Sequence, residues 1–150
     1  MRSEKIIETV LIIDDDIDDY LLVVDAVKQI DSRIVVYFVK SCEEALQYKD
    51  HKIDLVFLDI NMPLYDGFAW LKAIRDRGYN DLPVVMYTNS LSPEHIRKAY
   101  DEGANLYFVK PDSFNRLLRG LKELVTLDWS DPFSIKEKYK HKGNYGTFSF

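Results

Sequence analysis

Five short apolar runs recur along the chain, separated by longer amphipathic stretches. Each run is continuously apolar, without the alternation of a half-exposed strand, and such runs are typical of strands buried on both faces of a parallel sheet. They cover residues 10–13, 34–39, 55–58, 84–87 and 106–109. Strands that alternate with helices in this way predict right-handed crossovers and a parallel sheet with helices on both faces.

The stretches between the runs have the three- and four-residue spacing of amphipathic helices. The first such stripe consists of Ile17, Tyr20, Leu21, Val24 and Val27. Others consist of Phe68, Leu71 and Ile74, and of the leucines between 117 and 125, whose helix should begin at Asp112 or Ser113. Ser92 and Pro93 predict the N-cap and first turn of another helix, and Gly103 its end.

The composition fits a single cytoplasmic domain. Of the 150 residues, 47% are hydrophobic and 30% charged, as in soluble globular proteins. Cys42 is the only cysteine, which excludes an internal disulfide and favours a reducing compartment. No apolar run approaches the ~20 residues that span a bilayer, and the N-terminus lacks a signal-peptide pattern. The net charge of −5 argues against a general nucleic-acid binder.

Residues 128–150 break the alternating pattern, being aromatic, rich in lysine and without clear periodicity. We therefore expect one domain over residues 1–127 and a C-terminal tail over 128–150 that is too short to be a DNA-binding or other output domain. The lysine-rich stretch 136–142 is more typical of a solvated tail than of a contact with nucleic acid or membrane. The aromatic side chains of the tail suggest docking on a partner or a homodimer contact, since they are costly to leave exposed.

Polar residues follow the predicted strands at their carboxyl ends, where open α/β sheets bind ligands. Asp14 and Asp15 follow the first strand, Asp59 the third, Thr88 the fourth and Lys110 the fifth. If the first and third strands are neighbours, the three aspartates converge. Carboxylates that close together repel one another and should bind a hard divalent cation, for which Mg²⁺ is the natural candidate.

With a metal in place, one aspartate of this group can attack a phosphoryl group. The phosphoryl oxygens then need donors, which the hydroxyl of Thr88 and the ammonium of Lys110 can supply. Each residue alone has a simpler explanation, since an acidic run is usually a solvated helix start. Together, polar residues at four strand ends indicate phosphoryl chemistry.

Four stretches of the chain resemble the response-regulator receiver domain of two-component signalling. They are residues 11–16, 55–67, 83–88 and 103–111, and the second contains the specific pattern Asp-x-x-Met-Pro-x-x-Asp-Gly. The resemblance runs from about Val10 to Leu127. It implies a flavodoxin-like (βα)5 fold, a doubly wound parallel sheet with strand order 2-1-3-4-5.

The resemblance also implies a metal site. By position, Asp59 resembles the phosphoryl acceptor and Asp15 the carboxylate that ligates Mg²⁺ directly. Asp14 would act on the metal mainly through water, and the backbone carbonyl of Asn61 would be a further ligand. The implied metal site therefore comprises Asp14, Asp15, Asp59 and Asn61.

The remaining implied residues belong to the switch. Thr88 resembles the hydroxyl that moves to meet the phosphoryl group, Lys110 the lysine that pairs with it, and Tyr107 the aromatic whose rotamer reports the switch. The Lys110–Pro111 bond is cis in relatives, which a proline allows. Asn89 departs from the family, in which a small residue usually follows the threonine, and it could narrow access to the site.

The implied function is that of a single-domain response regulator. A sensor histidine kinase, a histidine phosphotransfer protein or a small phosphodonor would supply the phosphoryl group to Asp59. The added charge would then reorder the face around the fourth helix, fifth strand and fifth helix, which binds an unknown downstream protein. The protein would modify only its own aspartate and would not be an enzyme with an external substrate.

Three other functions compete with this one. A haloacid dehalogenase-type phosphohydrolase would use Asp14 as its nucleophile, but the adjacent acidic pair that it needs after Lys110 is missing. A flavin carrier would not place carboxylates after its first strand. A receiver-like adaptor that is never phosphorylated would not need the full residue set. We expect His51, His95 and His141 to be ordinary surface or packing residues.

Overall fold

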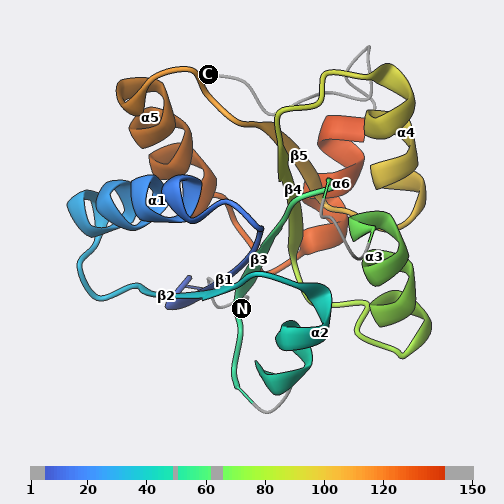
Figure 1. Ribbon diagram of the computed structural model, residues 1–150. Helices are drawn as coiled ribbons and strands as arrows, with labels where there is room; N and C mark the ends of the chain where they lie inside the picture. Colours follow the sequence, from blue (N-terminus) through green and yellow to red (C-terminus); the bar gives the residue numbers. More distant parts are fainter. Residues whose placement is uncertain (1–5, 49–50, 62–65, 141–150) are drawn as a thin grey trace.

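The structure, a computed structural model, describes residues 6–48, 51–61 and 66–140. Its centre is a parallel sheet of five strands in the order β2-β1-β3-β4-β5 (Figure 1). The strands are β1 (Thr9–Ile13), β2 (Val35–Val39), β3 (Leu55–Leu58), β4 (Val84–Thr88) and β5 (Leu106–Val109). The predicted fold class and strand order are therefore confirmed.

Helices cover both faces of the sheet. On one face lie α1 (Ile17–Ile30) and α5 (Phe114–Val125), which contact each other. On the other lie α2 (Cys42–Ala45), followed by the 3-10 turn η1 (Leu46–Tyr48), then α3 (Gly67–Asp76) and α4 (Pro93–Asp101) (Figure 1). A last helix, α6 (Pro132–Lys140), contacts β5. No helix in the described part of the chain has the length and apolarity needed to cross a bilayer.

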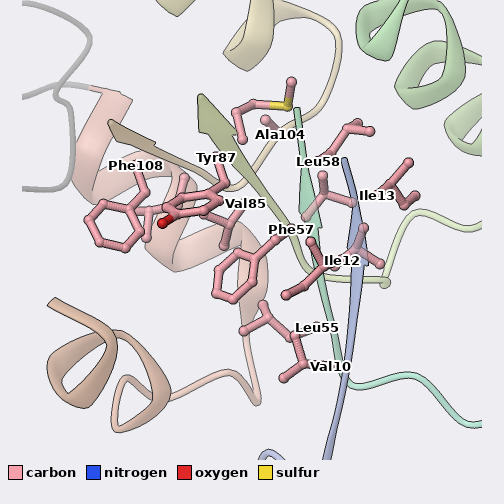
Figure 2. Packing of buried hydrophobic residues seen from close by; sticks show 14 of the residues in the cluster. Val10, Ile12, Ile13, Leu55, Phe57, Leu58, Val85, Tyr87, Ala104 and Phe108 are labelled. Carbon is pink, nitrogen blue, oxygen red and sulfur yellow. The ribbon is translucent and has the colours of Figure 1, made fainter. Parts of the chain in front are cut away.

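The core is built by the continuous apolar strands. Every residue of β3 and β4 is buried, as expected of central strands between two helical layers. Rings from three neighbouring strands follow one another across the sheet, with 5.6 Å between the ring centres of Phe57 and Tyr87 and 5.4 Å between those of Tyr87 and Phe108 (Figure 2). This packing fixes the register that places the strand ends side by side.

The predicted helix signals have the expected geometry. Ser92 caps α4 by accepting a hydrogen bond from the backbone N–H of His95, and Pro93 is its first residue. Ser113, and not Asp112, caps α5. After α4, Gly103 has φ +111°, a left-handed conformation that glycine adopts without the penalty paid by other residues.

The buried face of α1 agrees with the predicted stripe only in part: Val27 is buried as predicted, and Tyr20 and Val24 are half-buried. Its fully buried residues are Val23, Ala26 and Val27, whereas Leu21 is 50% exposed and Ile17 48% exposed. Apolar residues surround much of this helix, so spacing alone does not choose the face.

The segment after residue 127 contains structure that the sequence did not predict. Trp129 is fully buried, and its Nε1–H donates to the carbonyl of Leu124 over 2.9 Å. In α6, Ile135 and Tyr139 are also buried. They form a single pair four residues apart, too little to register as periodicity. Residues 141–150, and with them the aromatic end of the tail, lie outside the described residues.

Candidate functional site

The predicted acidic residues come together at the carboxyl edge of the sheet. Ile13, the last residue of β1, is in register with Leu58, the last residue of β3. The next residues, Asp14 and Asp59, are therefore neighbours, and the Asp59 N–H donates to the carbonyl of Ile13 over 3.0 Å. Carboxylate oxygens of Asp14, Asp15 and Asp59 lie within 4.8 Å of one another. Asp14 and Asp59 are buried and Asp15 is exposed.

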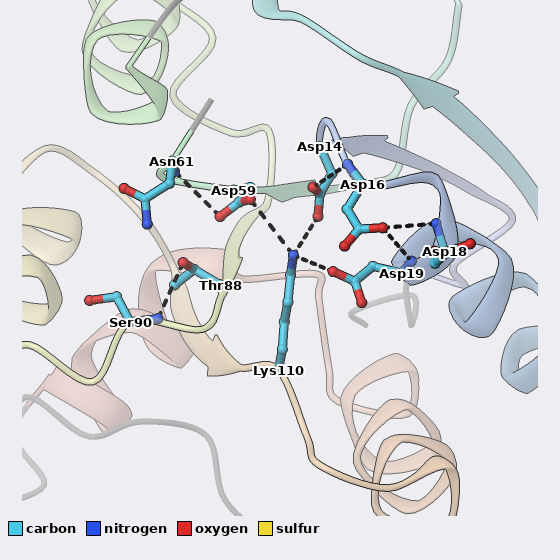
Figure 3. Close-up of polar contacts among 9 residues, drawn as sticks. All are labelled: Asp14, Asp16, Asp18, Asp19, Asp59, Asn61, Thr88, Ser90 and Lys110. Carbon is cyan, nitrogen blue, oxygen red and sulfur yellow. Dashed lines mark hydrogen bonds and ion pairs between the residues drawn. The ribbon is translucent and has the colours of Figure 1, made fainter. Parts of the chain in front are cut away.

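Lys110 extends from the end of β5 into this acidic group (Figure 3). Its Nζ lies 2.8 Å from Asp14 Oδ2, 2.6 Å from Asp19 Oδ2 and 3.7 Å from Asp59 Oδ2. Burial by itself would lower the pKa of Lys110. Hydrogen bonds to Asp14 and Asp19 act in the opposite direction and outweigh burial, so the pKa of Lys110 lies above its ordinary value. The lysine is therefore a permanent cation at neutral pH.

The charge of Asp14 is disfavoured by burial. Burial raises its pKa to about 6, although Lys110 and the Asp16 N–H, 3.0 Å from Asp14 Oδ1, act in the opposite direction. Apart from the ion pair with Lys110, the buried Asp14 Oδ2 has no hydrogen-bond donor among the described residues. A carboxylate oxygen whose one described partner is an ammonium group, and which lies beside two other carboxylates, fits a divalent cation that prefers oxygen ligands.

Asp59 sits on a tight turn that leads toward α3. The N–H of Asn61 reaches Asp59 Oδ1 over a long 3.4 Å. A Cβ atom on Gly67 would lie 2.3 Å from the carbonyl oxygen of Asp59, so only glycine allows the start of α3 to pack this close. Asp66 caps that helix by accepting from the N–H of Phe68 over 2.9 Å. Residues 62–65, which include the Met-Pro of the motif, lie outside the described residues.

Thr88 is connected to the loop between β4 and α4. It is fully buried, and its Oγ1 accepts from the N–H of Ser90 over 3.4 Å. The carbonyl of Ser90 in turn accepts from the Tyr107 hydroxyl over 2.8 Å. The Oγ of Ser90 lies 2.6 Å from Nδ1 of His95. His95, which was expected to be an ordinary surface or packing residue, links α4 to this loop through this contact.

Two features of the site differ from expectation. Asp19 was not singled out in the acidic run 14–19, yet it makes the shortest contact with Lys110, at 2.6 Å. The one sequence signal for this contact was the position of Asp19 in the first turn of the helix that follows the first strand. The bond between Lys110 and Pro111 was expected to be cis, but the described residues contain no cis peptide bond. The trans form of an X–Pro bond is the more stable one by roughly 0.5–1 kcal/mol.

The chain is similar to known response regulators. A family model described as the response regulator receiver domain matches residues 10–122. The probable C4-dicarboxylate response regulator DctR of Priestia megaterium is 32% identical over 116 residues, which are 77% of this chain and 50% of DctR. The two-component response regulator ORR3 of Oryza sativa subsp. japonica is 30% identical over 105 residues, which are 68% of this chain and 79% of ORR3. The chain spans about half the length of several relatives, including DctR.

Solved structures of similar proteins share the fold. The chemotaxis response regulator CheY4 of Vibrio cholerae superposes with a TM-score of 0.66 at 30% identity, over 79% of this chain and 98% of CheY4. The phosphorylated cyanobacterial phytochrome response regulator RcpA superposes with a TM-score of 0.72 over 79% of this chain and 91% of RcpA. Its 24% identity is evidence for the fold alone.

Proposed function

The chain belongs to the response regulator receiver domain family, and we propose that it accepts a phosphoryl group on Asp59 in a Mg²⁺-dependent reaction. The donor would be a sensor histidine kinase or a histidine phosphotransfer protein. The observation that carries the proposal is the convergence of Asp14, Asp15 and Asp59 within 4.8 Å beside Lys110. Proteins of this family are signalling proteins and not classical enzymes, and this chain would modify only its own aspartate.

Asp59 is the better nucleophile of the two buried aspartates. Both oxygens of Asp14 are engaged at short range, by the Asp16 N–H at 3.0 Å and by Lys110 Nζ at 2.8 Å. The corresponding contacts of Asp59 are longer, 3.4 Å to the Asn61 N–H and 3.7 Å to Lys110 Nζ. Asp59 is also 7% exposed against 1% for Asp14. Its lone pairs are therefore more available for attack on phosphorus.

The transfer needs both a cation and hydrogen-bond donors. Asp14, Asp15, Asp59 and the backbone carbonyl of Asn61 would hold Mg²⁺, which offsets the charge of carboxylates and phosphoryl oxygens when bound. An oxygen of Asp59 would bond to phosphorus as the bond from phosphorus to the donor imidazole nitrogen breaks. Lys110 and the hydroxyl of Thr88 would then hold the phosphoryl oxygens.

The signal would leave the site through the β4–α4 loop. If the Thr88 hydroxyl turns toward the phosphoryl group, the N–H of Ser90 loses its acceptor. Ser90 is also bound by Tyr107 and His95, so its movement would disturb β5 and α4 together. We expect the face formed by α4, β5 and α5 to change its affinity for a downstream protein, because a switch requires a partner that binds the two states differently.

The domain boundaries and the setting are also proposed. The receiver unit would comprise residues 1–127, with residues 128–150 as a C-terminal tail whose described part packs on β5. The tail would also serve as a docking segment for a partner or for a second copy of the chain. A cytoplasmic setting would agree with the single unpaired Cys42 and with a kinase as phosphodonor.

Intact mass spectrometry tests the proposal directly. The protein is incubated with Mg²⁺ and acetyl phosphate or phosphoramidate, and the wild type is compared with Asp59→Asn. We expect a labile gain of one phosphoryl group in the wild type only. A gain that survives Asp59→Asn but disappears in Asp14→Asn would favour the phosphohydrolase, and no gain with any donor would favour a receiver-like adaptor.

A further inference from the structure

A second cavity lies away from the acidic site, on the face covered by α2 and α3. Its volume is about 330 Å³, within the range of roughly 300–1,000 Å³ that is typical of small-molecule pockets. Leu11 of β1 and Val56 of β3 form its floor, and Trp70 and Ile74 of α3 form one wall. Tyr48 of η1 also lines the cavity.

The cavity exists because the connection from β2 to β3 covers the sheet thinly. Its regular structure is the four-residue helix α2 and the three-residue turn η1, against ten residues for α3. Ala45, at the end of α2, contributes only a methyl group to the lining. About two short helical turns therefore cover these strands, against nearly three continuous turns in α3.

The mouth of the cavity is basic. His51, Lys52 and Arg77 belong to its lining, and no acidic residue does among the described residues. Lys52 and Arg77 are exposed, and neither takes part in an ion pair of the described residues. The ring of His51 is held by Tyr37 and Tyr48, with ring centres 5.5 Å and 5.0 Å away. In a chain of net charge −5, this is a local excess of positive charge.

The lining also contains a hydrogen-bond donor without an acceptor. The side chain of Trp70 is buried, and its Nε1–H has no hydrogen-bond partner among the described residues. A buried donor left unpaired costs roughly 1–3 kcal/mol. The N–H group is itself shielded from solvent, so the features that the cavity offers a ligand are its apolar interior and the exposed basic side chains at its mouth.

We propose that this cavity binds a small carboxylate with an apolar tail. The tail would contact Leu11, Val56 and Ile74, and the carboxylate would lie at the mouth near Lys52 and Arg77. The mouth residues His51 and Lys52 precede β3, at the amino edge of the sheet, whereas Asp59 follows β3 at the carboxyl edge. Binding is therefore independent of the phosphoryl acceptor and is a function additional to the one proposed above.

Tryptophan quenching by bromoalkyl probes tests the site. The chain has two tryptophans, and the Trp129→Phe variant leaves Trp70 as the only one. The probes are 8-bromooctanoate, 8-bromooctanol and 8-bromooctyl-trimethylammonium, which share a tail and differ in head-group charge. We expect saturable quenching that is strongest for the carboxylate and is reversed by unbrominated octanoate.

A second set of variants locates the head group and the tail of the ligand. These variants keep both native tryptophans, and their binding of octanoate is measured by calorimetric titration. Lys52→Ala and Arg77→Ala should each weaken binding by up to about fivefold, which is the effect of losing one exposed ion pair. The double variant should weaken binding more than either single variant. Lys122→Ala, an exposed lysine of α5 on the other face, is the matched control and should not weaken it. Ala45→Leu fills the cavity and should abolish binding.

Two results would overturn the proposal. One is equal affinity for the three head groups, and the other is the absence of saturable quenching by any of them. The head-group series does not depend on whether Ala45→Leu folds. Asp59→Asn should bind octanoate like the wild type, so that a failure of the phosphorylation proposal and a failure of this one give different results.

Discussion

Two buried aspartates at opposite edges of the sheet should respond in opposite directions to the same substitution. Asp14 is 1% exposed at the carboxyl edge, and Asp54 is 4% exposed just before β3. We expect Asp14→Asn to stabilise the metal-free protein and Asp54→Asn to destabilise it. The difference follows from the hydrogen-bond donors that surround each carboxylate.

For Asp14, the magnitude follows from the cost of its charge. Burial raises its pKa to about 6, and a tenfold change in proton affinity corresponds to about 1.4 kcal/mol. Ionised Asp14 therefore lowers the free energy of unfolding at pH 7 by an upper limit of about 3 kcal/mol. The pKa of about 6 already includes the opposing effect of Lys110, which lies 2.8 Å away. Asparagine removes the charge and leaves Lys110 paired with Asp19, so we expect a net gain of ~1–2 kcal/mol, below the upper limit.

For Asp54, the carboxylate is well satisfied. Its Oδ2 accepts from the N–H of Glu8 over 2.9 Å and from that of Thr9 over 3.0 Å. Hydrogen bonds to a charged group contribute roughly 1.5–3 kcal/mol, and the amide oxygen of asparagine can replace them only in part. We therefore expect Asp54→Asn to lose about 1–2 kcal/mol.

Urea unfolding, followed by circular dichroism at pH 7, measures both changes. In EDTA the two variants should differ from the wild type with opposite signs. Added Mg²⁺ should stabilise the wild type and Asp54→Asn by mass action, and Asp14→Asn much less. Our reasoning would be refuted if Asp14→Asn were less stable than the wild type in EDTA, or if it kept the full gain from Mg²⁺.

The pH dependence provides a further check. Because the pKa of Asp14 is raised in the folded protein, the folded state binds this proton more tightly than the unfolded chain does. The contribution of Asp14 to stability is therefore least unfavourable below about pH 4 and falls as the pH rises to about 6. The advantage of Asp14→Asn in EDTA should shrink progressively between pH 7 and pH 4.

Two further predictions concern residues outside the acidic site. Arg75→Met should lower the free energy of unfolding by ~2–4 kcal/mol, because the Arg75 guanidinium donates to the carbonyls of Tyr79, Leu82 and Gly103. The same substitution at the exposed Arg77 should change the free energy of unfolding by less than ~0.5 kcal/mol. Equal urea midpoints for the two variants would contradict this prediction. Cys42 should not react with Ellman's reagent at pH 8 unless the protein unfolds, because burial raises the pKa of its thiol to about 12; rapid labelling under native conditions would show that the thiol is accessible.

The site could be predicted from the sequence because parallel strands place their carboxyl ends at one edge. Once the apolar runs before Asp14 and Asp59 are recognised as neighbouring strands, convergence of the two carboxylates follows without knowledge of side-chain packing. The same holds for Lys110, whose N–H donates to the carbonyl of Thr88 over 2.8 Å across the ends of β4 and β5. Strand order alone places these groups.

The contacts that were missed depend on side chains from helices. Asp19 reaches Lys110 across 91 positions in the sequence, and its spacing in the acidic run does not distinguish it from Asp18. His95 meets Ser90 only because α4 begins close to the β4–α4 loop. The buried face of α1 was likewise decided by packing against α5 and the sheet. Such contacts depend on helix rotation, which apolar spacing determines only within broad limits.

The carboxyl edge of the sheet holds the reacting groups, whereas the buried polar groups at the amino edge serve stability. A site that receives both a cation and a phosphoryl group has to leave carboxylate oxygens available, and we expect ionised Asp14 to be destabilising for that reason. The amino edge has no such requirement: Asp54 binds two backbone N–H groups, and Asn105 Oδ1 accepts from Val84 N–H and Arg75. These satisfied networks offset the penalty at the carboxyl edge. Substitutions at Arg75 or Asp54 should therefore change the urea midpoint while leaving the Mg²⁺ dependence of phosphorylation unchanged, because they act on the part of the sheet that holds no reacting group.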